Sequence, residues 1–238
     1  MRLRHRMTSQ MLRGTGAAQY FDDTAVALAA ARLIGIVGYT PVLDVFPLSG
    51  LLVRELRKRL PDDGSVAIEN MSWGPIHIVQ RFQDVGVVRP ERLVLVGGTS
   101  VSTEPGRVRA YRWMGGKLRE QEVQERVYEA VTGIVDIENT LVIGEYFGIW
   151  PAECFVVEAD IPGNAFGCMV MADNEQRADD HVLARELGFS PGRMRKEIGG
   201  IAAALAICGA GADVRLEEKF STALGPGATF LHQRFVAG

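Results

Sequence analysis

The sequence predicts an α/β protein, a three-layer α-β-α domain whose mixed, mostly parallel sheet of five twisted strands lies between helices. Short apolar runs, such as LIGIV at 33–37 and LVLV at 93–96, have the length and composition of buried strands. Segments with helical spacing lie between them, and the clearest is GLLVRELRKRL at 50–60. Short strands that alternate with helices are typical of a sheet covered by helices on both faces.

The first half of the chain follows this alternation closely. A short alanine-rich helix is expected at 22–31, with the acidic pair Asp22 and Asp23 as its N-terminal cap. Ser49 is placed to cap the helix at 50–60, and Gly97 and Gly98 directly follow the third apolar run. In order, the predicted elements are a strand at 33–37, a helix at 50–60, a strand at 66–69, a helix at 75–82 and a strand at 93–96.

The second half is less regular. Residues 108–113 alternate as a half-buried strand that Gly115 and Gly116 are expected to end, and residues 117–131 carry charges at helical spacing. Ser190 and Pro191 open a helix, since proline is well tolerated at the first helical position. The remaining predictions are a helix from Asp136 or Glu138 to about 147, a strand at 154–159, helices at 179–187 and 190–207, and a last strand at 229–236.

Bulk properties narrow the class of protein. With a net charge of −3 and a pI near 5.9, the chain lacks the basic footprint of a nucleic-acid-binding protein. Its three cysteines show no CxxC spacing, which favours a reduced, cytoplasmic protein. Charges or glycines interrupt the most apolar stretches, so no membrane span is expected. We predict one domain at 33–207, between an N-terminal extension at 1–32 and a C-terminal extension at 208–238.

Four segments, in this order, carry a resemblance to a known family. They are LIGIVGYTPVLD with the helix after it, SVAIENMSWGPIHIVQRF, RLVLVGGTSVSTEPGRVRAYRW, and CFVVEADIP with GFSPGRMRKEIGGIAAALA. Together they cover roughly residues 33–207 and resemble the hydrogenase maturation proteases, which trim the C-terminus of the large subunit of nickel–iron hydrogenases. The resemblance implies a mixed five-stranded sheet and a metal site at the strand ends, where two carboxylates and one histidine hold a divalent ion, nickel in that family.

The ligand positions implied by the resemblance are only partly kept. The first falls on the loop after strand one, where the acidic pair is reduced to Asp44, and Tyr39 replaces the asparagine of the Gly-Asn signature. The second falls on Glu69, in place of an aspartate. Asp136 is the nearest substitute for the histidine, and Glu138 is the next. An all-carboxylate set would favour an oxygen-ligand metal such as magnesium, manganese or calcium over nickel.

Other residues near the expected cleft have alternative explanations. Gly97 and Gly98 are suited both to shape a peptide-binding surface and to serve as plain turn residues, and Trp73 is the candidate aromatic contact for substrate. Three more aromatic residues are expected to flank the cleft or to pack in the core: Tyr146, Phe147 and Trp150. Asp44 is equally suited to cap the turn that follows it, and the position of Asp136 is typical of a helix N-cap.

Three functions follow from the resemblance. The first is a metal-dependent endopeptidase that acts on the C-terminal extension of a hydrogenase large subunit precursor. The second is a non-catalytic relative that binds the same precursor as a chaperone or assembly factor. The third is an enzyme whose altered carboxylate site acts on another peptide or a small substrate. The incomplete ligand set favours the second function, whereas Asp44 and Glu69 are compatible with the first.

Overall fold

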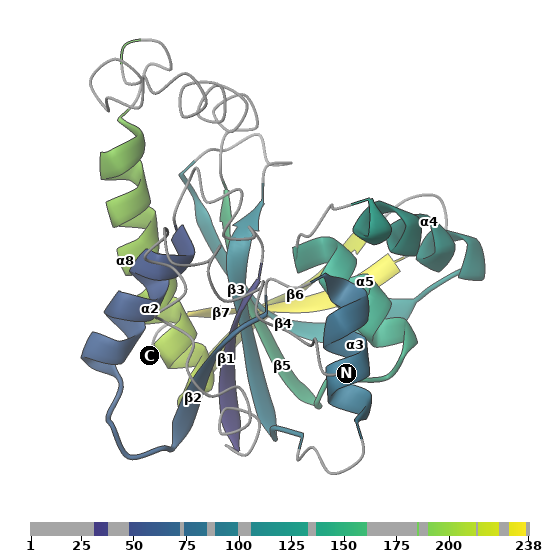
Figure 1. Ribbon diagram of the computed structural model, residues 1–238, viewed down its shortest axis with the longest axis horizontal. Helices are drawn as coiled ribbons and strands as arrows, with labels where there is room; N and C mark the ends of the chain where they lie inside the picture. The colour runs from purple at the N-terminus through teal and green to yellow at the C-terminus, as the bar shows by residue number, and fades with distance from the viewer. Residues whose placement is uncertain are drawn as a thin grey trace, which may run out of the picture.

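The computed structural model describes residues 31–37, 48–71, 74–84, 89–99, 106–132, 137–160, 185, 190–212, 214–223 and 229–236. These residues form an α/β fold with one mixed sheet of seven strands in the order β2-β1-β3-β5-β4-β7-β6 (Figure 1). The strands are β1 (Arg32–Val37), β2 (Val66–Asn70), β3 (Arg92–Thr99), β4 (Val108–Lys117), β5 (Glu153–Asp160), β6 (Arg215–Ala223) and β7 (Thr229–Val236).

The sheet has a parallel half and an antiparallel half. Strands β2, β1, β3 and β5 run parallel to one another. Strand β4 runs antiparallel to β5, and β7 and β6 continue the sheet in antiparallel pairs. The sheet therefore has more strands than the five expected, and its pairings are evenly divided between parallel and antiparallel.

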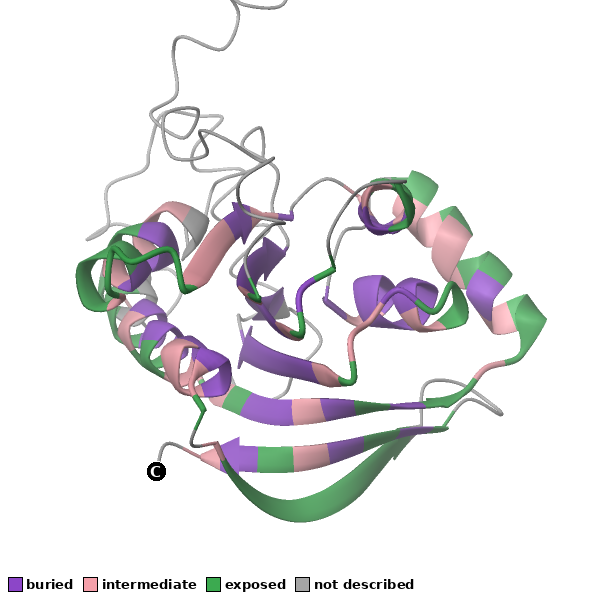
Figure 2. Cartoon of the chain, turned by 90° about the horizontal axis from the view of Figure 1, so that it is seen from below, coloured by how far each residue is buried: buried purple, intermediate pink, exposed green. Residues whose placement is uncertain are grey.

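Helices cover both faces of the sheet. The described helices are α2 (Leu48–Arg59), α3 (Pro75–Gln83), α4 (Glu120–Val131), α5 (Ile137–Tyr146) and α8 (Pro191–Ala210). Helices α2 and α8 pack on one face, and α3, α5 and α4 lie on the other (Figures 1 and 2). Alternate residues of each strand serve the two cores: Leu33 and Val37 contribute to the α3–α5 side, and Ile34 and Ile36 to the α2–α8 side.

Two differences from the predicted strands have a physical reason. Strand β6, RLEEKFSTA, was not expected because charged residues interrupt it, and Arg215 to Thr222 are all exposed at the sheet edge. Strand β4 continues through Gly115 and Gly116, where a shift of register marks a bulge instead of an end. Gly115 has φ +73°, a backbone conformation that glycine adopts without strain.

The other elements agree with the predictions to within a few residues. Helix α8 begins as expected at Pro191, and the Ser190 side chain accepts a hydrogen bond from the backbone N–H of Arg193. Strand β7 spans the predicted range. The helices expected at 22–31 and 179–187 lie outside the described residues, apart from residue 31, which is in a bend, and the single helical residue 185. None of the helices in the described part of the chain is long and apolar enough to cross a membrane.

Candidate functional site

The carboxyl ends of the four parallel strands meet at one edge of the sheet. Strand β1 pairs with β2 on one side and with β3 on the other. The chain thus adds β2 on one side of β1 and then crosses to the other side to add β3, which makes β1 a point where the strand order reverses. Ligands of open α/β sheets bind at such a switch point, outside the carboxyl ends of the strands. This carboxyl edge is the candidate functional site.

Gly97 lies in β3 at the switch point, opposite Val37 of β1. A Cβ atom at Gly97 would lie 2.4 Å from the carbonyl oxygen of Val37 and 3.0 Å from the Cδ1 atom of Ile137, at the start of α5. The absence of a side chain thus allows α5 to begin close to the sheet. Gly98 is also part of β3 and is buried, so both glycines belong to the strand and not to a turn after it.

Glu69 lies near the carboxyl end of β2, with only 3% of its surface exposed. Its Oε1 atom is 2.8 Å from Nη2 of Arg81, on α3. The contact is an ion pair without hydrogen-bond geometry, and in the part of the chain that the structure describes neither carboxylate oxygen has a hydrogen-bond partner. Burial raises the pKa of Glu69 to about 7, although the Arg81 guanidinium opposes that shift.

This environment does not fit a divalent metal ion at Glu69. The Arg81 guanidinium is in contact with the carboxylate and already provides the positive charge that an ion would bring. Within the described ranges, no three His, Cys, Asp or Glu side chains are grouped closely enough to hold a metal. Asp44, Asp136 and Trp73 lie outside those ranges, so the three-carboxylate site and the Trp73 contact stay predictions.

A second charged group lies on the same face of the sheet, at the ends of β4 and β5. Nη2 of Arg109 is 2.9 Å from Oδ1 of Asp160 and 3.3 Å from Oε2 of Glu158. Asp160 is 1% exposed, whereas the Arg109 side chain is 43% exposed and reaches the solvent. The pKa of the neighbouring Tyr111 lies well above its usual value, because the phenol is buried and Glu158 disfavours a phenolate.

His232 of β7 lies beside this group and is 5% exposed. Its ring stacks on Phe220 at 5.0 Å and meets Tyr111 edge-on at 4.8 Å. Its Nδ1 atom is buried, and no hydrogen-bond partner for it occurs among the residues that the structure describes. Burial lowers the pKa of His232 to about 4, and the positive charge of Arg109 acts in the same direction.

The sequence analysis did not single out Arg81 or this second group. The spacing of Glu158 and Asp160 is a usable signal, because side chains two residues apart on a strand point to the same face. Their location after the apolar run CFVV then predicts paired carboxylates at the carboxyl edge. Nothing in the local sequence indicates that Arg109 or His232 joins them, since both come from strands that are distant along the chain.

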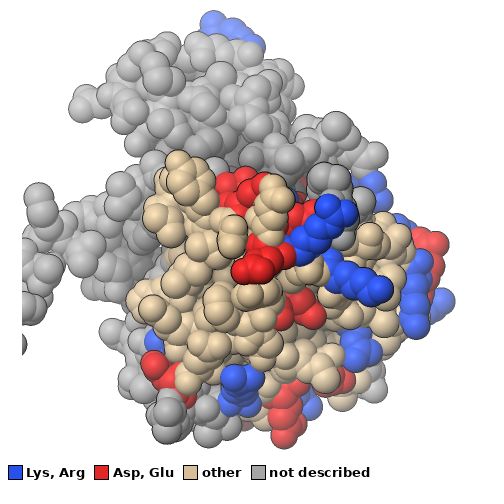
Figure 3. Space-filling model, turned by 90° about the vertical axis from the view of Figure 1, so that its right-hand side faces the viewer, with Lys and Arg blue, Asp and Glu red and all other residues tan. Residues whose placement is uncertain are grey.

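Three of the aromatic residues expected near the cleft, Tyr146, Phe147 and Trp150, lie elsewhere. Trp150 immediately precedes the segment that leads into β5, so it lies at the amino edge, opposite the candidate site. Tyr146 and Phe147 are at the end of α5 and form an exposed apolar groove with Tyr128 and Val131 of α4. The side of the molecule that carries α4 has a broad uncharged area beside a group of acidic and basic side chains (Figure 3).

Comparison with protein-family models and with curated proteins found no match to this chain. The fold and the arrangement of the described residues are therefore the basis for assigning a function.

Gly97 offers a direct test of how tightly the candidate site is built. We expect Gly97→Val to destabilise the protein by about 1–3 kcal/mol, because the added side chain must displace the Val37 carbonyl or Ile137. Urea unfolding measures the loss. Gly64→Val is unsuitable as a control because of its positive φ, whereas Gly200→Ala, in helix α8, adds a Cβ in open space. Equal stability of Gly97→Val and the parent protein would contradict the close approach of β1 and β3.

Proposed function

We propose that this chain is a hydrogenase-maturation-protease-like protein that acts on the C-terminal extension of a hydrogenase large subunit precursor. The sheet supports the proposal, because the strands β2-β1-β3-β5-β4 form the mixed five-stranded arrangement that the resemblance implies. Strands β6 and β7 are an addition to that arrangement. The location of Glu69 and Gly97 at one edge agrees with a site at the strand ends.

Within this proposal, binding of the precursor without cleavage is favoured over peptidase activity. The observation that carries this choice is the Arg81 guanidinium on the Glu69 carboxylate, which makes Glu69 a poor metal ligand as it is placed. Arg109 offers an exposed guanidinium for polar contacts with a peptide, held in place by Asp160. The metal-dependent endopeptidase remains the alternative, and it requires ligands from Asp44 or Asp136.

The intact mass of a hydrogenase large subunit precursor from the same cells distinguishes these possibilities. In cells that lack this protein, we expect the large subunit to keep its C-terminal extension, because maturation stalls without the binding protein. In a mixture of the two purified components, we expect a complex in which the precursor mass is unchanged. Arg109→Gln should weaken that complex by about tenfold, the loss typical of one charged contact, and Arg54→Gln serves as the control on the distant helix α2.

Two outcomes change the conclusion. Removal of the extension by the purified protein, with loss of that activity in Asp44→Asn and Asp136→Asn, would establish the endopeptidase instead. A large subunit that is trimmed equally in cells with and without this protein, and that forms no complex with it, would exclude both functions.

A further inference from the structure

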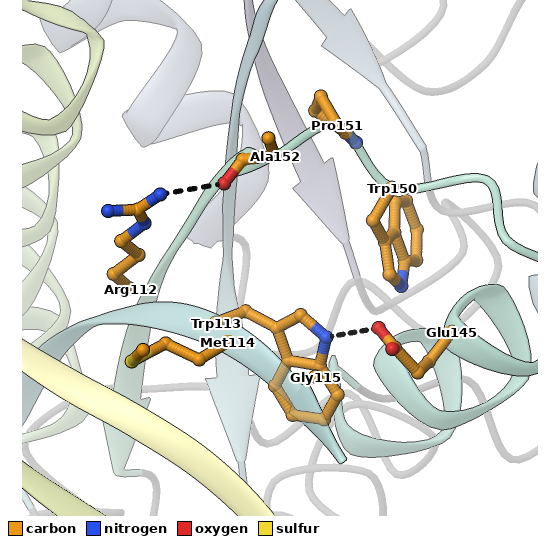
Figure 4. Close-up of a pocket in the computed structure, with 8 residues that line it drawn as sticks. All are labelled: Arg112, Trp113, Met114, Gly115, Glu145, Trp150, Pro151 and Ala152. Carbon is orange, nitrogen blue, oxygen red and sulfur yellow. Dashed lines mark hydrogen bonds between the residues drawn. The ribbon is translucent and has the colours of Figure 1, made fainter.

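A cavity of about 340 Å³ opens at the amino edge of the sheet, on the opposite side from the candidate site. It lies between the segment that leads into β5 and the bulged part of β4 (Figure 4). Its lining includes Arg112, Trp113 and Gly115 from β4, Glu145 from α5, and Trp150 and Ala152 from the segment before β5. The proposed function uses none of them.

One side of the cavity is built around the Glu145 carboxylate. The Trp113 indole N–H donates to Oε2 at 2.7 Å. A Cβ atom on Gly115 would lie 2.5 Å from Oε1, so glycine at the bulge leaves room for this second oxygen. No basic side chain of the described residues pairs with Glu145, and the last turn of α5 contains no basic residue. The negative end of the helix dipole adds to the carboxylate charge, and both favour a cation.

The Trp150 ring lies on the same side of the cavity as Glu145 (Figure 4). Its indole N–H donates to the carbonyl oxygen of Leu141 at 2.9 Å, and its ring packs on Gly144, where a Cβ would lie 2.2 Å from the ring. These contacts fix the ring in one orientation. Indole is the aromatic group that attracts an ammonium ion most strongly. A carboxylate and a fixed indole on one wall therefore match the chemistry of a primary ammonium group.

Arg112 lies on the other side of the cavity from Glu145 (Figure 4). Its guanidinium donates to the carbonyl oxygen of Ala152 at 3.0 Å, which holds the side chain along the rim. A guanidinium has five N–H donors, so this hydrogen bond leaves others for a ligand, and carboxylates are its preferred acceptors. The two walls thus carry opposite charges, with a space between them large enough for a small molecule.

We propose that this cavity binds a short peptide in its zwitterionic form, with the peptide ammonium at Glu145 and Trp150 and its carboxylate at Arg112. A free amine alone satisfies one wall, and a free carboxylate satisfies the other. Only a ligand that has an ammonium group at one end and a carboxylate at the other complements both walls. The proposal does not depend on the proposed function, because the two sites lie at opposite edges of the sheet and share no residue.

The experiment is calorimetric titration of the full chain with diglycine, triglycine and tetraglycine. We expect saturable binding of at least one of them, set by the span between the two charged walls. The N-acetylated and C-amidated forms of that probe should bind about tenfold more weakly or worse, because each lacks one charged contact. Glu145→Gln should weaken binding of the unmodified probe by about tenfold, and so should Arg112→Gln.

Matched variants separate a site effect from a fold effect. Glu125→Gln on α4 and Arg54→Gln on α2 change exposed residues of the same types away from the cavity, and both should bind the probe as the parent protein does. The absence of saturable heat for all three peptides would overturn the proposal. Equal binding of the unmodified and the two blocked forms would overturn it as well, as would full affinity in Glu145→Gln or in Arg112→Gln.

Discussion

Replacing Arg81 by methionine should lower the free energy of unfolding by about 3–5 kcal/mol at about pH 8, the cost of leaving one charge of a buried ion pair without its partner. The loss should shrink at lower pH. Glu69 already has a pKa near 7 with the guanidinium in place, and without it the carboxyl takes up a proton even more readily. Protonation removes the buried charge, so each pH unit above about 7, where Glu69 is ionised in the parent protein but still protonated in the variant, adds about 1.4 kcal/mol to the cost.

Urea unfolding of Arg81→Met at several pH values measures this dependence. The double variant Arg81→Met, Glu69→Met is the control, because replacing both members of a buried pair by apolar side chains is often nearly neutral. We expect it to recover most of the stability and to lose the dependence on pH. A loss in Arg81→Met that is the same at about pH 6 and pH 8 would mean that Glu69 is not the residue that Arg81 stabilises.

The pairing of Glu69 with Arg81 also shows which parts of the molecule were predictable. The strands β1, β3 and β5 were predicted because they are buried on both faces, and such strands are continuous apolar runs in the sequence. The edge strand β2 is only half-buried, and its short apolar run VAI was enough to predict it. Helix α3 was expected for the same kind of reason, since its apolar residues recur at helical spacing. Local pattern and burial agree in these elements.

The pattern fails where neighbours in the sheet, and not local sequence, decide the structure. Strand β6 is exposed along its length and is held by its pairing with β7. Gly115 and Gly116 are typical of a break, yet β4 continues past them because β7 pairs with it on the far side of the bulge. Contacts such as Arg109 with Asp160, or His232 with Tyr111, join residues more than 50 positions apart, and no local spacing predicts them.

Two buried groups of the parent protein have pKa values shifted in opposite directions. Their effects on how the free energy of unfolding changes with pH should therefore nearly cancel. Glu69 has a raised pKa, near 7, so its contribution is present at low pH and is lost as the pH rises from about 4.5 to 7. His232 has a lowered pKa, near 4, so its contribution is present above about pH 6.5 and is lost as the pH falls toward 4. Between about pH 4.5 and 6.5 the two slopes are similar in size and opposite in sign.

A variant that lacks one of the two groups should show the pH dependence of stability that the other group causes. Relative to the parent protein, Glu69→Gln should become more stable by about 1.4 kcal/mol per unit as the pH rises from about 4.5 to 6.5, roughly 3 kcal/mol across the window. His232→Phe, which keeps an aromatic ring against Tyr111 and Phe220, should show the reverse trend. The midpoint of urea unfolding at several pH values gives both slopes.

Other carboxylates, including Glu158 and Asp160, are present in all three proteins, so their contributions cancel in the comparison. Parallel profiles for the two variants would mean that neither group is as deeply desolvated as its burial implies, whereas diverging profiles would tie the pH dependence of the fold to Glu69 and His232.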